Sequence, residues 1–250
     1  MEKRLESVVR TDVLGVPVDV VKPEDLPAVF AQLVEGREHH QIVFIRLWDL
    51  LRARRSRSFR MTLRHASLVI PVTKGIVSGA RFLQRREPYR YSPFDFVIKL
   101  LNAVEQKRAS LYLLGLRRNE LLRVEQNIRE TFPGIRLVGR YAGYYHPSVE
   151  TDIVTAIKKA GPSLLLAGTG VPHGNRWLSG KMAEFHPGIY LWSQEVMDIL
   201  ADRRARPSRR AVEMGTDYLG EAVRHPWRVL RFFVYGWYVI LLLVYRVFKK

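Results

Sequence analysis

Residues 148–170 read SVETDIVTAIKKAGPSLLLAGTG and contain a complete helix followed by a complete strand. The first part, 148–160, has the spacing of an amphipathic helix, and two lysines in its last turn and then Gly161 mark its end. The second part, Ser163–Gly168, is short and continuously apolar, which is typical of a strand buried on both faces. This stretch therefore predicts a sheet with helices packed on both sides.

The same alternation extends in both directions from this stretch. Five further short apolar runs are typical of buried strands, namely Ile42–Leu47, Ser67–Val72, Ser110–Leu116, Ile135–Ala142 and Gly188–Trp192. Helical patterns lie at Pro23–Gly36, Ser92–Lys107 and Arg117–Phe132. Strands that alternate with helices predict a Rossmann-like α/β domain over residues 1–205, with a mostly parallel sheet flanked by helices. Such sheets bind ligands at the carboxyl ends of their strands.

Composition limits the classes of function. The chain has 250 residues, of which 41 are Lys or Arg and 24 are Asp or Glu, so its formal charge is +17. A hydrophobic content of 47% excludes a disordered basic tail, and the absence of cysteine excludes disulfides, thiolate metal sites and a cysteine nucleophile. The seven histidines lack metal-binding spacing, so we expect no metal and no cofactor. The charge indicates an anionic partner: nucleic acid, a phosphorylated metabolite or a membrane.

The C-terminal residues 206–250 form a basic helical appendage with one strongly apolar segment. Phe232–Tyr245 reads FFVYGWYVILLLVY, and as a helix it would measure about 21 Å, less than the roughly 30 Å hydrocarbon core of a bilayer. Widened to 227–248, the segment could just cross the bilayer; alternatively it lies in the interface, or it is a terminal core helix. We expect membrane contact, carried by Trp227, Arg228, Arg231, Trp237 and Arg246.

Two loops that follow predicted strands are candidate phosphate sites. Glycines in Gly168-Thr169-Gly170-Val171-Pro172 would let backbone amides approach a phosphate, although the same residues also suit an ordinary tight turn. Lys74 follows the strand at 67–72 and is either a point charge for a phosphate or a solvated loop lysine. The arginine-rich stretch Arg52–Arg64 reads most simply as a solvated helix face, with phosphate or lipid contact as the alternative.

Several motifs occur in the order found in one bacterial enzyme family. They are Leu14–Asp19, Ala66–Pro71, Ser92–Phe96, Phe132-Pro133-Gly134 with Gly143-Tyr144-Tyr145, Gly168–Pro172, and Arg206-Pro207-Ser208 with Met214–Leu219. On these motifs, residues 14–231 resemble the WecG/TagA/CpsF glycosyltransferases (glycosyltransferase family 26), as a divergent member. That family transfers an N-acetylmannosamine-type sugar from a UDP donor to a polyprenyl-diphosphate-linked GlcNAc during surface polysaccharide synthesis.

The resemblance implies where substrates bind. It implies a nucleotide-sugar pocket at Tyr144 and at Gly168, Thr169, Gly170 and Pro172, and it adds Arg206 as a substrate-binding residue. Lys74 is a further candidate from its position after a predicted strand. The partners would be a nucleotide sugar, a polyprenyl-linked glycolipid, an anionic membrane and, in some members, a second copy of the chain. We expect the protein at the cytoplasmic face of the bacterial inner membrane, either peripheral or held by a single C-terminal anchor. A nucleic-acid partner is not favoured, since no nucleic-acid motif occurs.

The departures from the family pattern bear on catalysis. The family's Asp-Gly after the second strand, with the aspartate as the proposed general base, corresponds here to Val72-Thr73. Its Asn corresponds to Leu47, its Gln-Glu to Gly174-Asn175, and one tail arginine to Glu221. Since valine cannot accept a proton, an active enzyme would need Asp95, which matches a family acid, or Asp49 as its base. The alternative is a catalytically inactive pseudo-glycosyltransferase that acts as a scaffold or regulator at the membrane.

Overall fold

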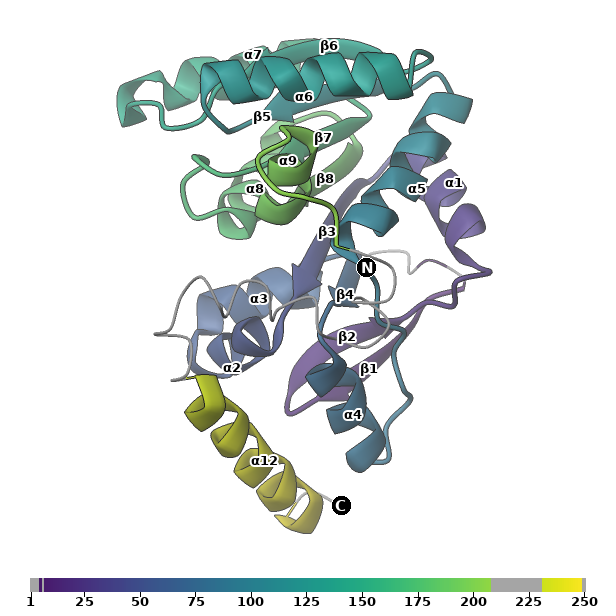
Figure 1. The fold of residues 1–250 in the computed structure, drawn as a ribbon, viewed down its shortest axis with the longest axis vertical. Coiled ribbons are helices and arrows are strands. Elements are labelled where there is room, and N and C mark those ends of the chain that lie inside the picture. Colours follow the sequence, from purple (N-terminus) through teal and green to yellow (C-terminus); the bar gives the residue numbers. More distant parts are fainter. Residues whose placement is uncertain (1–4, 6, 208–230, 249–250) are drawn as a thin grey trace.

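The structure, a computed structural model, describes residues 5, 7–207 and 231–248. Its centre is a six-stranded sheet in the order β4-β3-β8-β7-β5-β6, in which every neighbouring pair is parallel (Figure 1). The strands are β3 (His39–Ile45), β4 (Leu68–Pro71), β5 (Ser110–Leu114), β6 (Arg136–Tyr141), β7 (Leu164–Ala167) and β8 (Gly188–Trp192). All six coincide with the apolar runs predicted as strands, so the predicted fold class is confirmed.

Helices cover both faces of the sheet because the side chains of each strand alternate between two cores. In β7, Leu164 and Leu166 belong to one cluster of buried residues and Leu165 and Ala167 to another. The first face carries α1 (Leu26–Glu35), α5 (Pro93–Gln106), α6 (Arg118–Thr131) and α9 (Gln194–Leu200). The other carries α2 (Leu47–Arg55), α3 (Arg57–His65), α4 (Lys74–Phe82), α7 (Glu150–Ala160) and α8 (Asn175–Lys181), with short η1 (Pro147–Val149) and η2 (Met182–Glu184) beside them.

The connections of the sheet change direction between β5 and β7. These strands are neighbours in the sheet, but β5 leads into α6 on one face and β7 leads into α8 on the other. In open α/β sheets, ligands bind where adjacent strands diverge in this way, outside the carboxyl ends of the strands. The topology therefore makes the loops after β5 and β7 the candidate ligand-binding loops.

A small hairpin precedes the sheet and was not predicted as such. Strands β1 (Val9–Val13) and β2 (Val16–Val20) pair antiparallel through a turn in which Leu14 and Gly15 both have positive φ. Asp19 is buried; it accepts two hydrogen bonds from the Arg10 guanidinium and one from the backbone N–H of Val69. Because Val69 belongs to β4, this paired carboxylate attaches the hairpin to the edge of the sheet.

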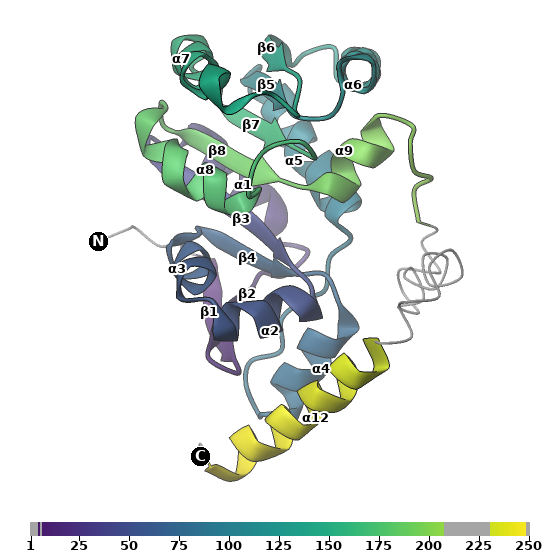
Figure 2. The same cartoon turned by 90° about the vertical axis from the view of Figure 1, so that its left-hand side faces the viewer.

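The apolar C-terminal segment forms α12 (Arg231–Phe248), which lies against α4 and α2 (Figures 1 and 2). Tyr238 and Leu242 are buried in the core shared with these helices. The outer face exposes large apolar side chains, namely Tyr235, Trp237, Val239, Ile240, Leu243, Val244, Val247 and Phe248. The helix thus combines features of a docked core helix and of an interfacial helix, and its outer apolar face has no covering element within the described residues.

Part of the predicted C-terminal appendage lies outside the described residues. Within the described part of the chain, no helix meets the length and hydropathy needed to cross a membrane. The predicted helical stretch 206–226 falls almost entirely outside the described residues, as do Trp227 and Arg228 and the side chain of Arg231. The domain boundary placed at residue 205 stays a prediction.

Candidate active site

Three loops at the carboxyl edge of the sheet are hydrogen-bonded to one another through their backbones. The N–H of Leu116, after β5, donates to the carbonyl oxygen of Thr169, after β7, at 2.6 Å. Gly143, after β6, donates to Leu116 at 2.8 Å, and Tyr144 donates to Gly170 at 2.9 Å. The loops after β5, β6 and β7 therefore form one connected surface. We call this surface the glycine platform (residues 115–116, 143–144 and 168–172).

The platform requires glycine where its loops approach most closely. Gly170 has a φ of +89°, and a Cβ there would lie 2.8 Å from the backbone nitrogen of Tyr144. Gly143 would likewise place a Cβ 2.8 Å from the Thr169 carbonyl oxygen. Tyr144 and Leu116 also have positive φ, at 57° each, a conformation that costs non-glycine residues about 1–3 kcal/mol. Such strained backbone often marks a functional site.

Side chains at the platform include an exposed aromatic ring and a buried hydroxyl. The Tyr144 side chain is 60% exposed, a high value for a large aromatic residue held by two hydrogen-bonded loops. The Thr169 hydroxyl is buried and has no hydrogen-bond partner among the residues that the structure describes. Trp192, at the end of β8, donates a hydrogen bond from Nε1 to the carbonyl oxygen of Gly168 at 2.8 Å. This bond attaches the β7 loop to the neighbouring strand β8. The platform thus offers a rigid backbone, an unpaired hydroxyl and an exposed ring.

The structure brings together most of the substrate-binding residues predicted from the sequence. Tyr144, Gly168, Thr169 and Gly170 all belong to the platform, and Pro172 follows in the same loop. Lys74 does not join them, because it begins α4 after β4, and β3 and β8 separate β4 from β7. The three strand spacings from β4 to β7 amount to about 14 Å. Lys74 therefore lies at the carboxyl edge of the sheet, but in the half formed by β3 and β4.

That other half contains the position at which the family pattern has its aspartate. Val72 is 6% exposed, its N–H donates to the Ile45 carbonyl oxygen, and its own carbonyl accepts from Arg90 Nε at 2.9 Å. The residue is therefore a packed, hydrogen-bonded continuation of β4. Next to it, the Thr73 hydroxyl is buried without a hydrogen-bond partner at the start of α4.

Asp49 lies close by, in the first turn of α2 directly after β3. Its carboxylate accepts a hydrogen bond from the backbone N–H of Arg46 at 2.9 Å, which closes a capping box at this helix terminus. Burial raises the pKa of Asp49, and the Arg46 N–H only partly offsets this effect. A carboxylate of raised basicity at the carboxyl edge is chemically suited to accept a proton.

Asp95, the other predicted acid, is paired with a residue predicted to bind substrate. Arg206 Nη2 lies 2.6 Å from Asp95 Oδ1, and the Arg206 guanidinium stacks 5.3 Å from the centre of the Phe94 ring. Asp95 is in the first turn of α5, close to the end of β4, because the N–H of Tyr91 donates to the Pro71 carbonyl oxygen. The exposed Asp95 carboxylate is thus neutralised by a cation from the segment after α9.

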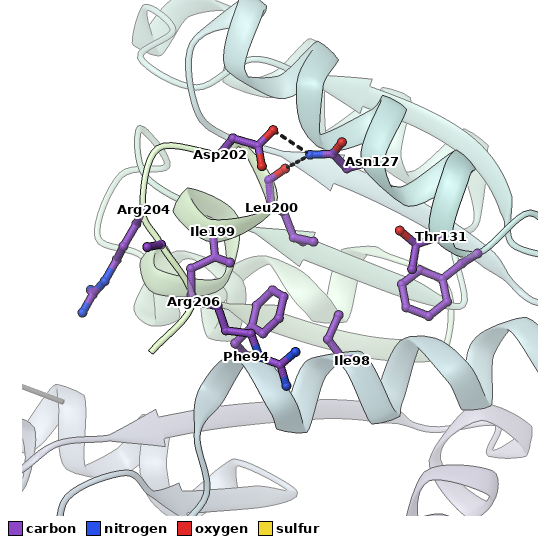
Figure 3. Close-up of a pocket in the computed structure, with 11 residues that line it drawn as sticks. Phe94, Ile98, Asn127, Thr131, Ile199, Leu200, Asp202, Arg204 and Arg206 are labelled. Atoms are coloured by element: carbon purple, nitrogen blue, oxygen red, sulfur yellow. Dashed lines mark hydrogen bonds between the residues drawn. The ribbon is translucent and has the colours of Figure 1, made fainter. Parts of the chain in front are cut away.

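A pocket adjoins this ion pair on the α5 face of the sheet (Figure 3). It has a volume of about 670 Å³ and lies between α5, α6, α9 and the segment 202–206. Its walls are mainly apolar, with Phe94, Ile98 and Leu200 among them, and Arg206 lies at one end. Asn127 of α6 donates to the carbonyl oxygen of Leu200 at 2.8 Å and to Asp202 at 3.1 Å, which holds the wall together.

One ion pair at the carboxyl edge was not anticipated from the sequence. Arg46, at the end of β3, pairs with Glu195, in the first turn of α9 after β8, at 2.6 Å. The two residues are far apart in the sequence, and only the adjacency of β3 and β8 brings them together. Among the described residues, no group of three or more His, Asp or Glu side chains is arranged to hold a metal ion.

Comparison with known proteins agrees with this geometry. The sequence model of the glycosyl transferase WecG/TagA/CpsF family matches residues 11–250. The chain is 20% identical over 174 residues to N-acetylglucosaminyldiphosphoundecaprenol N-acetyl-beta-D-mannosaminyltransferase of Bacillus subtilis, which covers 70% of this chain and 67% of that enzyme. The enzyme of the same name from Bacillus spizizenii is 20% identical over 115 residues, 46% of this chain and 44% of its own.

The family match covers nearly the whole chain, including the β1–β2 hairpin, the sheet, the glycine platform and α12. It agrees with the order of motifs in the sequence and with the parallel α/β sheet. The chain therefore belongs to the WecG/TagA/CpsF family of glycosyl transferases.

Proposed function

We propose that the protein transfers an N-acetylmannosamine-type sugar from a UDP-sugar to a polyprenyl-diphosphate-linked GlcNAc at a membrane surface. The names of the two Bacillus relatives supply the sugar and the acceptor. The observation that carries the proposal is the glycine platform, which lies at the point where α/β sheets bind ligands and whose loops are locked together by backbone hydrogen bonds.

The donor nucleotide is assigned to the platform. Glycines at 168 and 170 remove the side chains that would keep a diphosphate away from the backbone. The exposed Tyr144 ring offers a flat surface for a base, and the unpartnered Thr169 hydroxyl can donate to a phosphate or ribose oxygen. This arrangement directs the sugar along the edge toward β8, β3 and β4.

Asp49 is assigned as the general base. In the transfer, the acceptor hydroxyl gives its proton to this carboxylate and its oxygen bonds to the anomeric carbon of the sugar. At the same time, the bond between that carbon and the UDP oxygen breaks, and UDP leaves with the bonding electrons. Asp49 suits this role because its pKa is raised by burial, whereas Asp95 is held by Arg206. Lys74 is an exposed cation at this half of the edge and is assigned to the diphosphate of the acceptor.

The acceptor approaches from α12. The outer face of this helix is apolar and exposed, as expected of a helix that lies in the interface of a membrane. Its first turns adjoin the start of α4, where a Cβ on Gly75 would lie 3.8 Å from the Tyr235 ring. Lys74 directly precedes Gly75 and lies at the carboxyl edge of the sheet. A diphosphate at the membrane surface beside α12 would therefore be adjacent to that edge. We place the protein peripherally, on the cytoplasmic face.

One group of observations favours the inactive alternative. Val72 replaces the family aspartate, and two of the three carboxylates at this half of the edge, Asp95 and Glu195, are neutralised by arginines. If Asp49 serves only to cap α2, the protein would be a membrane-bound scaffold that retains the fold. Donor binding and transfer measured separately distinguish the two functions.

The first test is calorimetric titration of the purified chain with UDP, GDP and TDP and with their common sugars, alongside thermal unfolding. A ligand present at about 100 times its dissociation constant stabilises the native state by about 2.7 kcal/mol. We expect uridine nucleotides alone to bind and to raise the melting temperature. Absence of any shift in a cooperatively unfolding protein would contradict the donor assignment and favour the scaffold.

A further inference from the structure

The surface beside α12 is unusually rich in unopposed positive charge. No Asp or Glu occurs between Asp49 and Glu87, whereas this interval contains Arg52, Arg54, Arg55, Arg57, Arg60, Arg64, Lys74, Arg81, Arg85 and Arg86. The interval folds into α2, α3, β4, α4 and the turn after α4, of which α2 and α4 lie against α12. Much of this positive charge therefore lies on the part of the fold that carries α12.

These arginines are available to an external anion. Arg55 and Arg57, at the junction of α2 and α3, are exposed, as are Arg85 and Arg86 after α4. Within residues 7–207 and 231–248, none of these four forms an ion pair with a carboxylate, whereas Arg81 is paired with Glu87. These four exposed guanidinium groups can therefore bind an external anion without breaking an ion pair of the described fold.

Direct contacts place positive charge on both sides of the last turn of α12. On the α2 side, the Arg54 guanidinium lies 5.5 Å from the centre of the Tyr245 ring. On the α4 side, Arg246 of α12 lies 4.6 Å from the centre of the Phe82 ring, at the end of α4. The exposed apolar face of α12, which lies against α2 and α4 (Figure 2), therefore has an arginine on each side of its last turn.

We propose that the arginine border formed by Arg52–Arg64 and Arg85-Arg86 binds the headgroups of anionic phospholipids in the bilayer that receives α12. The inference rests on the membrane association proposed above and adds which lipids the protein selects. An apolar strip between two rows of guanidinium groups matches a bilayer interface, with acyl chains beneath α12 and headgroup phosphates on either side. A nucleic acid would leave the apolar strip uncovered, so the charge pattern favours lipid.

The test is cosedimentation of the full-length chain with vesicles of phosphatidylcholine alone and of phosphatidylcholine with phosphatidylglycerol. We expect stronger binding to the anionic vesicles, and the preference should decrease as salt screens the headgroups. Two charge-reducing variants, Arg55→Gln/Arg57→Gln and Arg85→Gln/Arg86→Gln, each remove two border cations. At about 1 kcal/mol per arginine, each should lower the affinity for anionic vesicles about 30-fold, with little change for neutral vesicles.

The matched control is Arg118→Gln/Arg123→Gln on α6, at the opposite end of the molecule from α12 (Figure 1). It changes the net charge by the same amount and should leave the vesicle preference unchanged. Equal loss in this control and in the border variants would show that net charge alone attracts the protein, and would overturn the inference.

A third variant separates this inference from the proposed membrane association. Ile240→Asp/Val244→Asp places charge on the exposed face of α12 and should abolish binding to both kinds of vesicle. Wild-type protein that binds both vesicles equally would overturn the lipid selectivity but preserve membrane association, whereas binding to neither would overturn both. Border variants that weaken binding to a single-stranded oligonucleotide but not to vesicles would assign the arginines to nucleic acid instead.

Discussion

Tyr238 of α12 stands over Gly79 of α4, and its hydroxyl donates a hydrogen bond to the Gly75 carbonyl oxygen at 2.9 Å. A Cβ at Gly79 would come within 2.9 Å of Tyr238 Cζ and closer still to the hydroxyl, and it would also touch Leu242. The absence of a side chain at Gly79 thus allows the apolar helix to dock, and this docking sets which face of α12 remains exposed.

Gly79→Ala should therefore weaken the docking of α12. Overpacking of a tight contact typically costs about 1–3 kcal/mol, and we expect a loss of this size in the free energy of unfolding, measured with urea. Gly236→Ala is the matched control on α12 itself, because a Cβ there meets nothing within 4 Å. An alanine that destabilises equally at both positions would contradict the assigned contact.

Gly170→Ala should damage the donor site without unfolding the domain. The substitution places a side chain at a φ of +89° and 2.8 Å from Tyr144, so the β7 loop must move away from the β6 loop. We expect UDP affinity to fall at least tenfold by calorimetry. The control, Gly180→Ala in α8, has open space around it and should keep the wild-type affinity. Unchanged UDP affinity in the Gly170 variant would place the nucleotide elsewhere.

Asp49→Asn and Asp95→Asn compare the two candidate bases. Asparagine at 49 can still accept the hydrogen bond from the Arg46 N–H, so the cap persists while the proton acceptor is lost. We expect a loss of turnover of at least about 100-fold for Asp49→Asn, with UDP affinity unchanged. Asp95→Asn removes the ion pair to Arg206 and should have the smaller effect. The reverse order would assign the base to Asp95.

His40 should make stability depend on pH on the acid side of neutrality. It is buried beside Ser67, and burial lowers its pKa below the ordinary 6.5. As the pH falls below 6.5, the unfolded chain takes up a proton that the folded chain does not, so the free energy of unfolding decreases. His40→Gln should remove this component, and denaturant unfolding at pH 5 and pH 7.5 measures it. An identical pH dependence in both proteins would show that other groups dominate.

Local patterns in the sequence were sufficient to predict the sheet. The apolar runs at Ser110–Leu116 and Ser163–Gly168 predicted β5 and β7, because strands buried on both faces must be continuously apolar. The Gly168–Pro172 loop could be named as a candidate site from local sequence, since its glycines directly follow the predicted strand. Its partner Tyr144 was identified by family resemblance alone.

Features that depend on distant residues could not be read in this way. The Arg46–Glu195 and Asp95–Arg206 pairs join residues more than 100 positions apart, and only the strand order brings them together. The role of Gly79 is invisible without α12 beside it. The arginine-rich stretch Arg52–Arg64 was visible in the sequence, where lipid contact was only the alternative to a solvated helix face. The absence of acids between Asp49 and Glu87 is the additional signal that favours the alternative.

The most direct measurement is the transfer reaction itself. The full-length chain, in anionic vesicles that contain polyprenyl-diphosphate-linked GlcNAc, is supplied with UDP-N-acetylmannosamine, and the lipid fraction is analysed by mass spectrometry. The account predicts a glycolipid heavier by one N-acetylhexosamine residue, with equimolar release of UDP, and loss of this product in Asp49→Asn. Protein that binds UDP and these vesicles but forms no product would contradict the assignment of a transferase.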